Sequence, residues 1–223
     1  MNRTELITFD LDGTLLDTAQ DFLFAVNQLR SKYDLSPCDP NEIRSRVSEG
    51  AVSLARFALN LNYKNEKQIE FHRKELLKIY ESCCLENTVP FEGIIELLEE
   101  INSSGLAWGI VTNKPIKFAT RIVDHFLSQY KPNFLVCPES TGERKPNPAG
   151  LVKACKLVNS KPSLSYYIGD HLIDIQAGKR AKMITIAAAY GYIPPGQSPL
   201  DWNAEYIAET PIQIKSFIPE LSK

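Results

Sequence analysis

The chain has 223 residues, of which 43% are hydrophobic and 23% charged. This is the balance of an ordinary globular protein and excludes a collagen-like, low-complexity or wholly disordered chain. Lysine and arginine number 25 against 27 acidic residues, for a formal net charge of −2, so the total gives no indication of a broad surface for nucleic acid or an anionic membrane. The length predicts one large domain, or a core that carries a smaller inserted module.

The cysteine and histidine content argues against a zinc centre. The five cysteines form no Cys-x-x-Cys pair, and the three histidines lie far apart in the sequence, whereas zinc needs clustered ligands. Such cysteines are typical of reduced, packed thiols in a reducing compartment. No stretch approaches the roughly 18 apolar residues of a membrane span. We therefore expect a cytoplasmic protein with no membrane partner.

The first elements in chain order are a strand and a long helical segment. An apolar run at residues 6–9 predicts a buried strand that ends at two acids. Phe22, Ala25, Val26 and Leu29 then recur at helical spacing, and Thr18 is the predicted N-cap of that helix. From there to about residue 85 the apolar spacing stays helical, and no strand-like run interrupts it.

Strands and helices alternate in the remainder of the chain. A helix over about 94–101 is stopped at residues 103–105. Strands are then predicted at 108–111, 134–137, 166–168 and 184–188, and helices at 117–127, 151–158 and 173–181. This alternation predicts a parallel sheet covered on both faces. The predicted fold is an α/β, Rossmann-like core made of residues 1–17 and 89–223, with an inserted all-helical module at 18–88.

Polar residues follow the predicted strands at the points where the strands end. They are Asp10, Asp12, Thr112, Asn113, Lys145, Asp170 and Asp174. Ligands of open parallel sheets bind beyond the carboxyl ends of the strands. Carboxylates packed together raise one another's pKa, and Mg²⁺ is a cation that prefers a few carboxylates together with substrate phosphate oxygens. The sequence therefore predicts a magnesium site that also binds phosphate.

The run from Asp10 to Thr14 suits phosphoryl transfer. A carboxylate can attack a phosphoryl group and form an aspartyl-phosphate, and a second carboxylate can protonate the leaving oxygen. Gly13 would let the backbone approach a phosphate, with its N–H as a donor. Two acids separated by one residue also arise by chance, and acids after strands often cap helices. Only the conjunction of these groups at one end of the sheet is specific.

Four segments resemble the motifs of the haloacid dehalogenase-like (HAD) phosphatases. The segments are 9–18, 111–113, 145–146 and 169–174. The inserted helical module lies where this family carries a helical cap. Within the family the chain is most similar to phosphoglycolate phosphatases. Residues 108–115 and 190–193, with Trp202 and Asn203 downstream, resemble the N-acetylmuramic acid 6-phosphate phosphatase branch.

The resemblance implies a role for each polar residue. Asp10 would be the nucleophile and Asp12 the general acid and base. Mg²⁺ would be held by the Asp10 carboxylate, the Asp12 backbone carbonyl and Asp170. Asp174 would orient the motif lysine or a metal-bound water, and His171 would be a bystander. The groups implied to bind the phosphoryl oxygens are Thr112, Asn113 and Lys145.

Specificity is expected from the insert, because the core handles only phosphate and metal. The most polar turn of the insert contains Arg44, Arg46, Ser48, Glu49 and Gly50. We predict that this turn reaches over the site and that Arg46 binds the substrate. The candidate substrates are 2-phosphoglycolate and N-acetylmuramic acid 6-phosphate, which both combine a phosphate with a carboxylate. The sequence leaves open whether the enzyme is a monomer or a homodimer.

Several alternatives share parts of this pattern. A dehalogenase would not need Asp12, and a phosphonate hydrolase would need a lysine in the insert that the sequence does not identify. A sugar phosphomutase with the same core stays open. A non-catalytic, phosphate-sensing receiver-like module is smaller, lacks the insert and carries its phosphorylated acid after a later strand. The irregular segment 190–203 is predicted either to be functional or to be a structural turn.

Overall fold

A six-stranded parallel sheet forms the centre of the computed structural model, which describes residues 3–61 and 65–222. The strand order is β5-β4-β1-β6-β7-β8. The strands are β1 (Leu6–Phe9), β4 (Ala107–Val111), β5 (Leu135–Val136), β6 (Ser165–Gly169), β7 (Ile184–Ala188) and β8 (Tyr206–Ala208). Strand β1 lies in the middle, where Phe9 is level with Ile110 of β4 and Ile168 of β6. The predicted α/β fold with a parallel sheet is confirmed.

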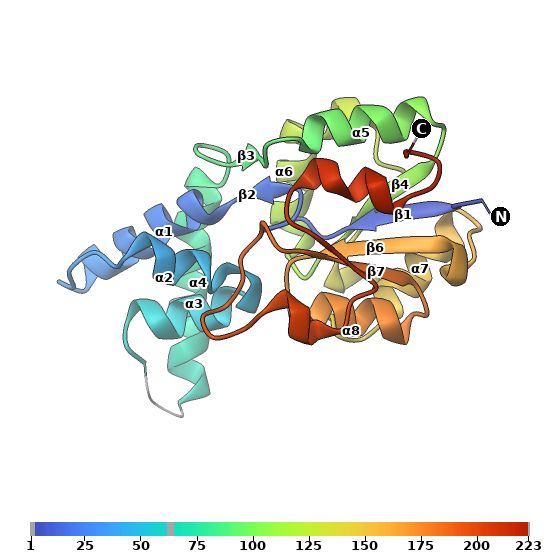
Figure 1. Ribbon diagram of the computed structural model, residues 1–223. Coiled ribbons are helices and arrows are strands. Elements are labelled where there is room, and N and C mark those ends of the chain that lie inside the picture. The colour runs from blue at the N-terminus through green and yellow to red at the C-terminus, as the bar shows by residue number, and fades with distance from the viewer. Residues whose placement is uncertain (1–2, 62–64, 223) are drawn as a thin grey trace.

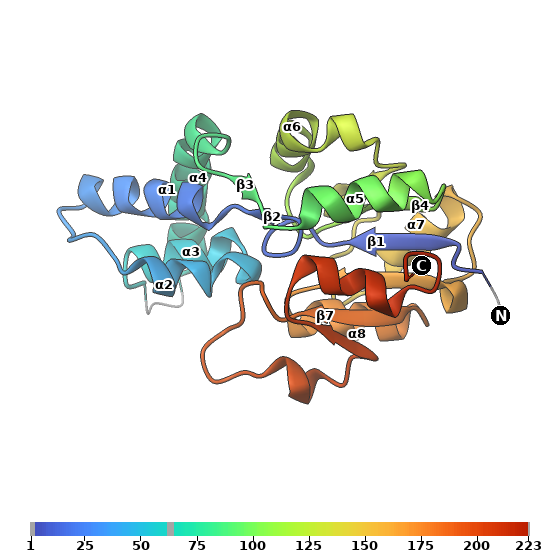
Figure 2. The ribbon, with the colours of Figure 1, turned by 45° about the horizontal axis from the view of Figure 1, so that its top comes forward.

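Helices cover both faces of the sheet (Figure 1). Helices α5 (Ile94–Ser103) and α6 (Ile116–Phe126) lie on one face, and α7 (Ala149–Leu157) and α8 (Leu172–Arg180) on the other (Figure 2). Side chains of a strand alternate between the two faces. Ile7 and Phe9 of β1 therefore join the α5 and α6 cluster, whereas Leu6 packs in the cluster formed with α7 and α8. Burial on both faces explains why the strands are short continuous apolar runs.

The inserted segment is helical and leaves the core at one point. Strands β2 (Leu16–Asp17) and β3 (Val89–Pro90) pair antiparallel, so they bring the two ends of the insert together. Between them lie α1 (Ala19–Lys32), α2 (Pro40–Arg44), α3 (Ala51–Ala58) and α4 (Glu66–Cys83). These helices stand beyond the carboxyl end of β1 (Figure 1). Residues 18–88 are called the cap below, and the remainder the core. Within the described residues, no helix is long and apolar enough to cross a membrane.

The start of α1 differs from the sequence prediction. Thr18 occupies the N-cap position, but its side chain accepts no hydrogen bond from the helix. Instead, its Oγ1 donates to Asp12 Oδ1 at 2.6 Å. The Tyr192 hydroxyl takes over the capping role, because it accepts from the backbone N–H groups of Thr18 (2.7 Å) and Ala19 (3.0 Å). A residue far away in the sequence thus satisfies the orphan donors of the helix.

Candidate active site

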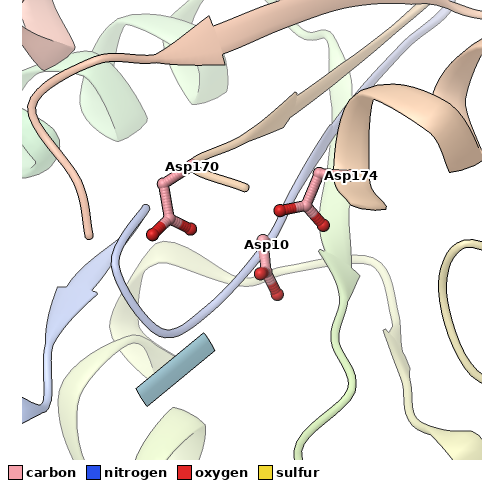
Figure 3. A group of neighbouring side chains, drawn as sticks. All are labelled: Asp10, Asp170 and Asp174. Carbon is pink, nitrogen blue, oxygen red and sulfur yellow. The ribbon is translucent and has the colours of Figure 1, made fainter. Parts of the chain in front are cut away.

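Three aspartates meet beyond the carboxyl ends of two neighbouring strands. Asp10 directly follows β1, Asp170 directly follows β6, and Asp174 lies in the first turn of α8. One carboxylate oxygen from each lies within 4.8 Å of the others, and all three residues are buried. Figure 3 shows the three side chains gathered beside the end of β1. Three of the acids that the sequence placed at this sheet edge are therefore neighbours in space.

Lys145 is the cation inside this acidic cluster. Its Nζ lies 2.8 Å from Asp10 Oδ1 and 2.7 Å from Asp174 Oδ1, and the residue is buried. The Tyr167 hydroxyl, which the sequence analysis did not single out, accepts from the same Nζ at 2.9 Å. Asp174 thus positions Lys145, in agreement with one of its two predicted roles.

The side chain of Asn113 braces the backbone of Lys145. Its Oδ1 accepts from the Lys145 N–H at 2.8 Å, and its Nδ2 donates to the Lys145 carbonyl at 3.1 Å. Thr112 is buried nearby, and its Oγ1 accepts from the backbone N–H of Lys114 at 3.1 Å. The Thr112 hydroxyl proton stays available to an anion. The Asn113 side chain therefore positions Lys145, and the prediction that Asn113 also binds phosphate stays a prediction.

The cluster holds three carboxyl groups and one ammonium group. Burial raises the pKa of Asp10 to about 7, although the ammonium of Lys145 works in the opposite direction. Burial, followed by the charges of Asp174 and Asp10, raises the pKa of Asp170 well above its ordinary value. A further cation would relieve this repulsion, and carboxylate oxygens are the donors that Mg²⁺ prefers. The residues present therefore fit the predicted metal.

Two hydrogen bonds and a closely packed glycine backbone fix the position of the Asp170 side chain. It accepts from Thr14 Oγ1 at 3.1 Å and from the Tyr192 N–H at 2.9 Å. Gly13 has φ +79°, and a Cβ there would lie 2.1 Å from Asp170 Oδ2, so only glycine fits. The Gly13 N–H donates to the Leu16 carbonyl at 3.0 Å. The predicted use of this N–H as a phosphate donor does not fit, because the turn itself consumes it.

Asp12 connects the core to the cap. Its Oδ1 accepts from Lys114 Nζ at 2.7 Å, in addition to the bond from Thr18. Lys114 is buried, and its Nζ also donates to the Tyr80 hydroxyl at 2.9 Å. The Nζ lies 4.7 Å from the ring centroid of Phe22 and 4.8 Å from that of Tyr80, and these two rings stack at 3.9 Å. Cation–π attraction to two rings of the cap, and the hydrogen bond that Lys114 donates to the Tyr80 hydroxyl, thus hold the partner of Asp12.

A cleft of about 510 Å³ separates the cap from the core at this point. Asp10, Asp12, Thr112, Asn113 and Lys145 all line it. Apolar and aromatic side chains complete the wall. They are Phe22, Val47, Val52, Leu77 and Tyr80 from the cap, and Pro115, Phe118 and Ile173 from the core. The cleft therefore offers a polar floor for phosphate and metal and an apolar wall for the rest of a substrate.

The polar turn of the cap reaches the site only in part. Ser48, Glu49 and Gly50 line the cleft, and Ser48 Oγ donates to Asp170 Oδ2 at 3.3 Å. The structure does not bring Arg46 to the cleft. Its guanidinium lies 4.2 Å from the Phe57 ring centroid and donates to the Glu42 carbonyl at 2.7 Å. Stacking on an aromatic ring of the cap thus holds this side chain away from the position that the sequence predicted.

Arg44, the other arginine of that turn, serves the junction of cap and core. Its guanidinium lies 4.8 Å from the Tyr192 ring centroid and forms an ion pair with Asp17 of β2. The Tyr192 hydroxyl also donates to Asp17 Oδ1 at 2.7 Å. Tyr192 therefore contacts the junction through its hydroxyl and Asp170 through its backbone. The beginning of the segment 190–203 is accordingly part of the site.

His171 lines the cleft and also begins α8. Its ring Nδ1 accepts from the backbone N–H of Ile173 at 3.3 Å, and its backbone N–H donates to Asp174 Oδ2 at 3.1 Å. Burial lowers the pKa of His171, so the ring is neutral at pH 7. The capping arrangement explains why both His171 and Asp174 occur where the fourth motif turns into the helix.

Two residues of the site were missed by sequence reasoning although signals for them exist. Tyr167 lies in a fully buried strand, and a buried tyrosine hydroxyl needs a hydrogen-bond partner. Lys114 directly follows Thr112 and Asn113, so the end of β4 was bound to place it near the site. Tyr80 gave no such signal, because its helix shows only regular apolar spacing.

Comparisons with known proteins agree with this geometry. The family described as haloacid dehalogenase-like hydrolase matches residues 7–188. The N-acetylmuramic acid 6-phosphate phosphatase of Pseudomonas aeruginosa is 38% identical over 95% of this chain and 93% of its own length. The phosphoglycolate phosphatase of Xanthomonas campestris pv. campestris is 34% identical, covering 93% of each chain. The crystal structure of a predicted phosphoglycolate phosphatase from Haemophilus somnus 129PT shares the fold, with a TM-score of 0.87 at 23% identity, covering 97% of this chain and 99% of its own. The chain therefore belongs to the haloacid dehalogenase-like hydrolase family, as a phosphatase of phosphoric monoesters.

Proposed function

We propose that the enzyme hydrolyses N-acetylmuramic acid 6-phosphate, with 2-phosphoglycolate as the second candidate. The size of the cleft carries this choice. Its volume of about 510 Å³ lies within the range of about 300–1,000 Å³ that holds ligands of the size of a drug molecule. A phosphorylated amino sugar with a lactyl ether would fill much of that space. A two-carbon acid would leave most of the apolar wall without a contact.

Similarity to named enzymes supports the same order of candidates. The relative from Pseudomonas aeruginosa that is named for N-acetylmuramic acid 6-phosphate is 38% identical to this chain. The relative from Xanthomonas campestris pv. campestris that is named for phosphoglycolate is 34% identical. Both activities use a phosphate ester on a molecule that also bears a carboxylate. The shared polar floor of the cleft serves either substrate, so the wall must discriminate between them.

The proposed reaction passes through an aspartyl-phosphate on Asp10. The Asp10 carboxylate attacks phosphorus while the bond from phosphorus to the sugar oxygen breaks, and Asp12 gives that oxygen its proton. Asp12 then takes a proton from water, whose oxygen attacks the aspartyl-phosphate and releases inorganic phosphate. Lys145 and the Thr112 hydroxyl neutralise and orient the phosphoryl oxygens during both steps.

Mg²⁺ is the proposed cofactor. The carboxylates of Asp10 and Asp170 and the backbone carbonyl of Asp12 would hold the ion. When bound, it would offset the charge that the nucleophile and the phosphoryl group share. The proposed location is the cytoplasm, because all five cysteines are free and four of them are buried. The proposed assembly is a monomer or a homodimer.

Phosphate release in the presence of Mg²⁺ tests the proposal. N-acetylmuramic acid 6-phosphate should be hydrolysed with a higher kcat/KM than 2-phosphoglycolate. Asp10→Asn removes the nucleophile with little change in size, so kcat should fall by about 10³-fold or more. Circular dichroism of the variant checks that the fold is retained. Activity that survives Asp10→Asn would disprove the covalent step, and a preference for 2-phosphoglycolate would overturn the choice of substrate.

The same assay separates the hydrolase from a sugar phosphomutase. A mutase would return a sugar that still carries phosphate, and its rate would depend on an added sugar bisphosphate. Accumulation of free N-acetylmuramic acid in step with inorganic phosphate, without any activator, is the result that we expect. A requirement for the bisphosphate would favour the mutase.

A further inference from the structure

Four cationic side chains line the cleft, and three of them are already paired within the protein. The four are Arg73, Lys114, Arg144 and Lys145. The ion pairs are those of Lys145 with Asp10 and Asp174, of Lys114 with Asp12 and of Arg73 with Glu70. A cation whose charge is matched by a neighbouring carboxylate has less attraction left for an anion of the substrate. The remaining arginine is therefore the one to consider.

Arg144 has no carboxylate partner among residues 3–61 and 65–222. Its Nη2 donates to the backbone carbonyl of Asn113 at 2.9 Å, which is a neutral acceptor. Within those residues, no acidic group lies within the 4.0 Å of an ion pair to its guanidinium. A guanidinium carries five N–H donors in a planar fork that matches a carboxylate. The side chain is exposed and lines the cleft, so a ligand in the cleft can reach these donors.

The position of Arg144 is set by the same residues that set the phosphoryl site. It directly precedes Lys145, whose backbone Asn113 clamps on both sides. Across the cleft stands Gly50 of the cap, where a Cβ would lie 3.8 Å from Arg144 Nη2. The guanidinium therefore stands between the phosphoryl site and the cap. This is the region that the part of the substrate remote from the phosphate must occupy.

We propose that Arg144 binds the lactyl carboxylate of N-acetylmuramic acid 6-phosphate and so determines specificity. The inference rests on the proposed function and names the residue that would enforce it. N-acetylglucosamine 6-phosphate has the same ring, acetamido group and phosphate but a hydroxyl in place of the lactyl ether. An unpaired arginine favours the anionic sugar through a charge-assisted, bidentate hydrogen bond. Arg144 thus takes the role that the sequence analysis gave to Arg46.

An acidic residue of the cleft lining also influences where a substrate carboxylate can bind. Glu49 also lines the cleft, and its Oε2 accepts from Ser53 Oγ on α3. A substrate carboxylate is repelled by Glu49 of the cap turn and attracted by Arg144 of the core.

The test compares the two sugar phosphates with Arg144→Gln. The unaltered enzyme should prefer N-acetylmuramic acid 6-phosphate over N-acetylglucosamine 6-phosphate by at least about tenfold in kcat/KM. Arg144→Gln should reduce that ratio by roughly 10- to 100-fold, the amount that a hydrogen bond between charged groups contributes. The reduction should be a rise in KM for the muramic acid substrate, with little change in kcat. Arg144→Lys, which keeps the charge but loses the fork, should reduce the ratio less.

Arg180→Gln is the matched control. Arg180 Nη1 donates to the Pro146 carbonyl at 2.8 Å, so it anchors the same loop, but it is not among the cleft-lining residues. Arg180→Gln should leave the ratio of kcat/KM for the two sugar phosphates unchanged. If Arg144→Gln lowers kcat/KM equally for both sugar phosphates, Arg144 only anchors the loop or binds phosphate. That result would overturn the inference.

Two further outcomes separate the inference from the proposed function. If the unaltered enzyme hydrolyses both sugar phosphates with equal kcat/KM, the carboxylate is not recognised, and the inference is wrong while a sugar phosphatase still stands. If the unaltered enzyme instead prefers 2-phosphoglycolate to both sugars, the proposed function fails, and the inference falls with it.

Discussion

Two buried lysines illustrate the difference between the core and the cap. Lys145 has all its polar partners in the core, since Asp10, Asp174 and Tyr167 lie on or directly beyond β1, α8 and β6. Lys114 has a mixed set. Its carboxylate partner, Asp12, belongs to the core, whereas the aromatic rings around its ammonium, Phe22 and Tyr80, belong to the cap. Lys145 is thus held entirely by the core, where the Tyr167 ring centroid also lies 5.6 Å from its Nζ, whereas Lys114 is held by the core and the cap together.

This difference separates the two proposed steps of the reaction. The groups around Asp10, the proposed nucleophile, all belong to the core. The groups around Asp12 depend on α1 and α4 of the cap, because these helices supply the rings and the hydroxyl that hold Lys114. Changes in the cap should therefore act on proton transfer to the leaving group, and changes around Lys145 should act on phosphoryl transfer itself.

Of the variants considered, Lys145→Met should cause the largest loss of kcat and of unfolding free energy. The variant leaves Asp10 and Asp174 without their shared cation, in a buried place. We expect kcat to fall by about 10²–10³-fold or more, the loss typical for removal of a group that stabilises charge in the transition state. Unfolding in urea should show a loss of about 3–5 kcal/mol, because breaking a buried ion pair leaves charge uncompensated.

Lys153→Met is the control for that prediction. Among residues 3–61 and 65–222, Lys153 Nζ donates to the Ser140 carbonyl at 2.8 Å and forms no ion pair, so its removal leaves none of their acids unpaired. It should retain kcat and lose less stability. If Lys145→Met kept kcat within tenfold of the unaltered enzyme, the core cluster would not need its internal cation, and the distinction between the two lysines would disappear.

Tyr80→Phe should have an intermediate effect. The variant keeps the ring over Lys114 and removes only the hydroxyl that accepts from its Nζ. Losing one hydrogen bond to a buried charge costs about 1.5–3 kcal/mol, and Lys114 is then free to shift against Asp12. We expect kcat for a sugar phosphate to fall by about tenfold. Hydrolysis of p-nitrophenyl phosphate should fall less, because its leaving group departs without a proton.

Tyr33→Phe is the matched tyrosine of the cap. Its hydroxyl donates to Glu75, outside the lining of the cleft, so both substrates should be hydrolysed at the rate of the unaltered enzyme. Equal losses on the sugar and the aryl phosphate in Tyr80→Phe would contradict the link from the cap to Asp12. They would indicate that Tyr80 only supports the packing of the cap.

The fold and the polar floor of the site were largely predictable from the sequence. Parallel strands buried on both faces are read as short apolar runs, and the residue after each run marks the same edge of the sheet. Asp10, Asp170 and Asp174 are neighbours for this reason. Strands β2, β3 and β8 were not predicted, because these two- or three-residue strands contain or adjoin acids or proline, whereas the equally short β5 lies inside a four-residue apolar run.

The wall of the cleft was less predictable than its floor. Helical spacing shows that Tyr80 and Phe22 face inward but not that they meet Lys114, which is far away in the sequence. Polarity alone made Arg46 a candidate, yet Phe57 of α3 supplies an aromatic ring and Glu42 of α2 a carbonyl that satisfy it. Arg144 was not singled out from the sequence, where it only precedes the motif lysine. Its significance depends on which acids lie near it, and only the folded chain shows that.

Glu75→Gln should have the smallest effect and tests the charges of the cap. Glu75 of α4 accepts from Lys32, from the Tyr33 hydroxyl (2.7 Å) and pairs with His72 Nδ1 (2.9 Å). Burial acts to raise the pKa of Glu75, but these hydrogen bonds outweigh it and lower the pKa to about 2. A lowered folded-state pKa contributes stability above the ordinary pKa of about 4.5, and this stability is lost as the pH falls toward 2.

We therefore expect Glu75→Gln to lose about 1 kcal/mol of unfolding free energy at pH 7, and less than that at pH 3, with kcat unchanged at pH 7. Urea unfolding at both pH values measures the difference. Glu70→Gln, which breaks the exposed pair with Arg73, should have a smaller effect at either pH. A loss in Glu75→Gln as large as that in Lys145→Met would contradict the comparison. It would mean that buried charge stabilises the cap as much as it organises the core, and that aromatic packing is not what holds the cap.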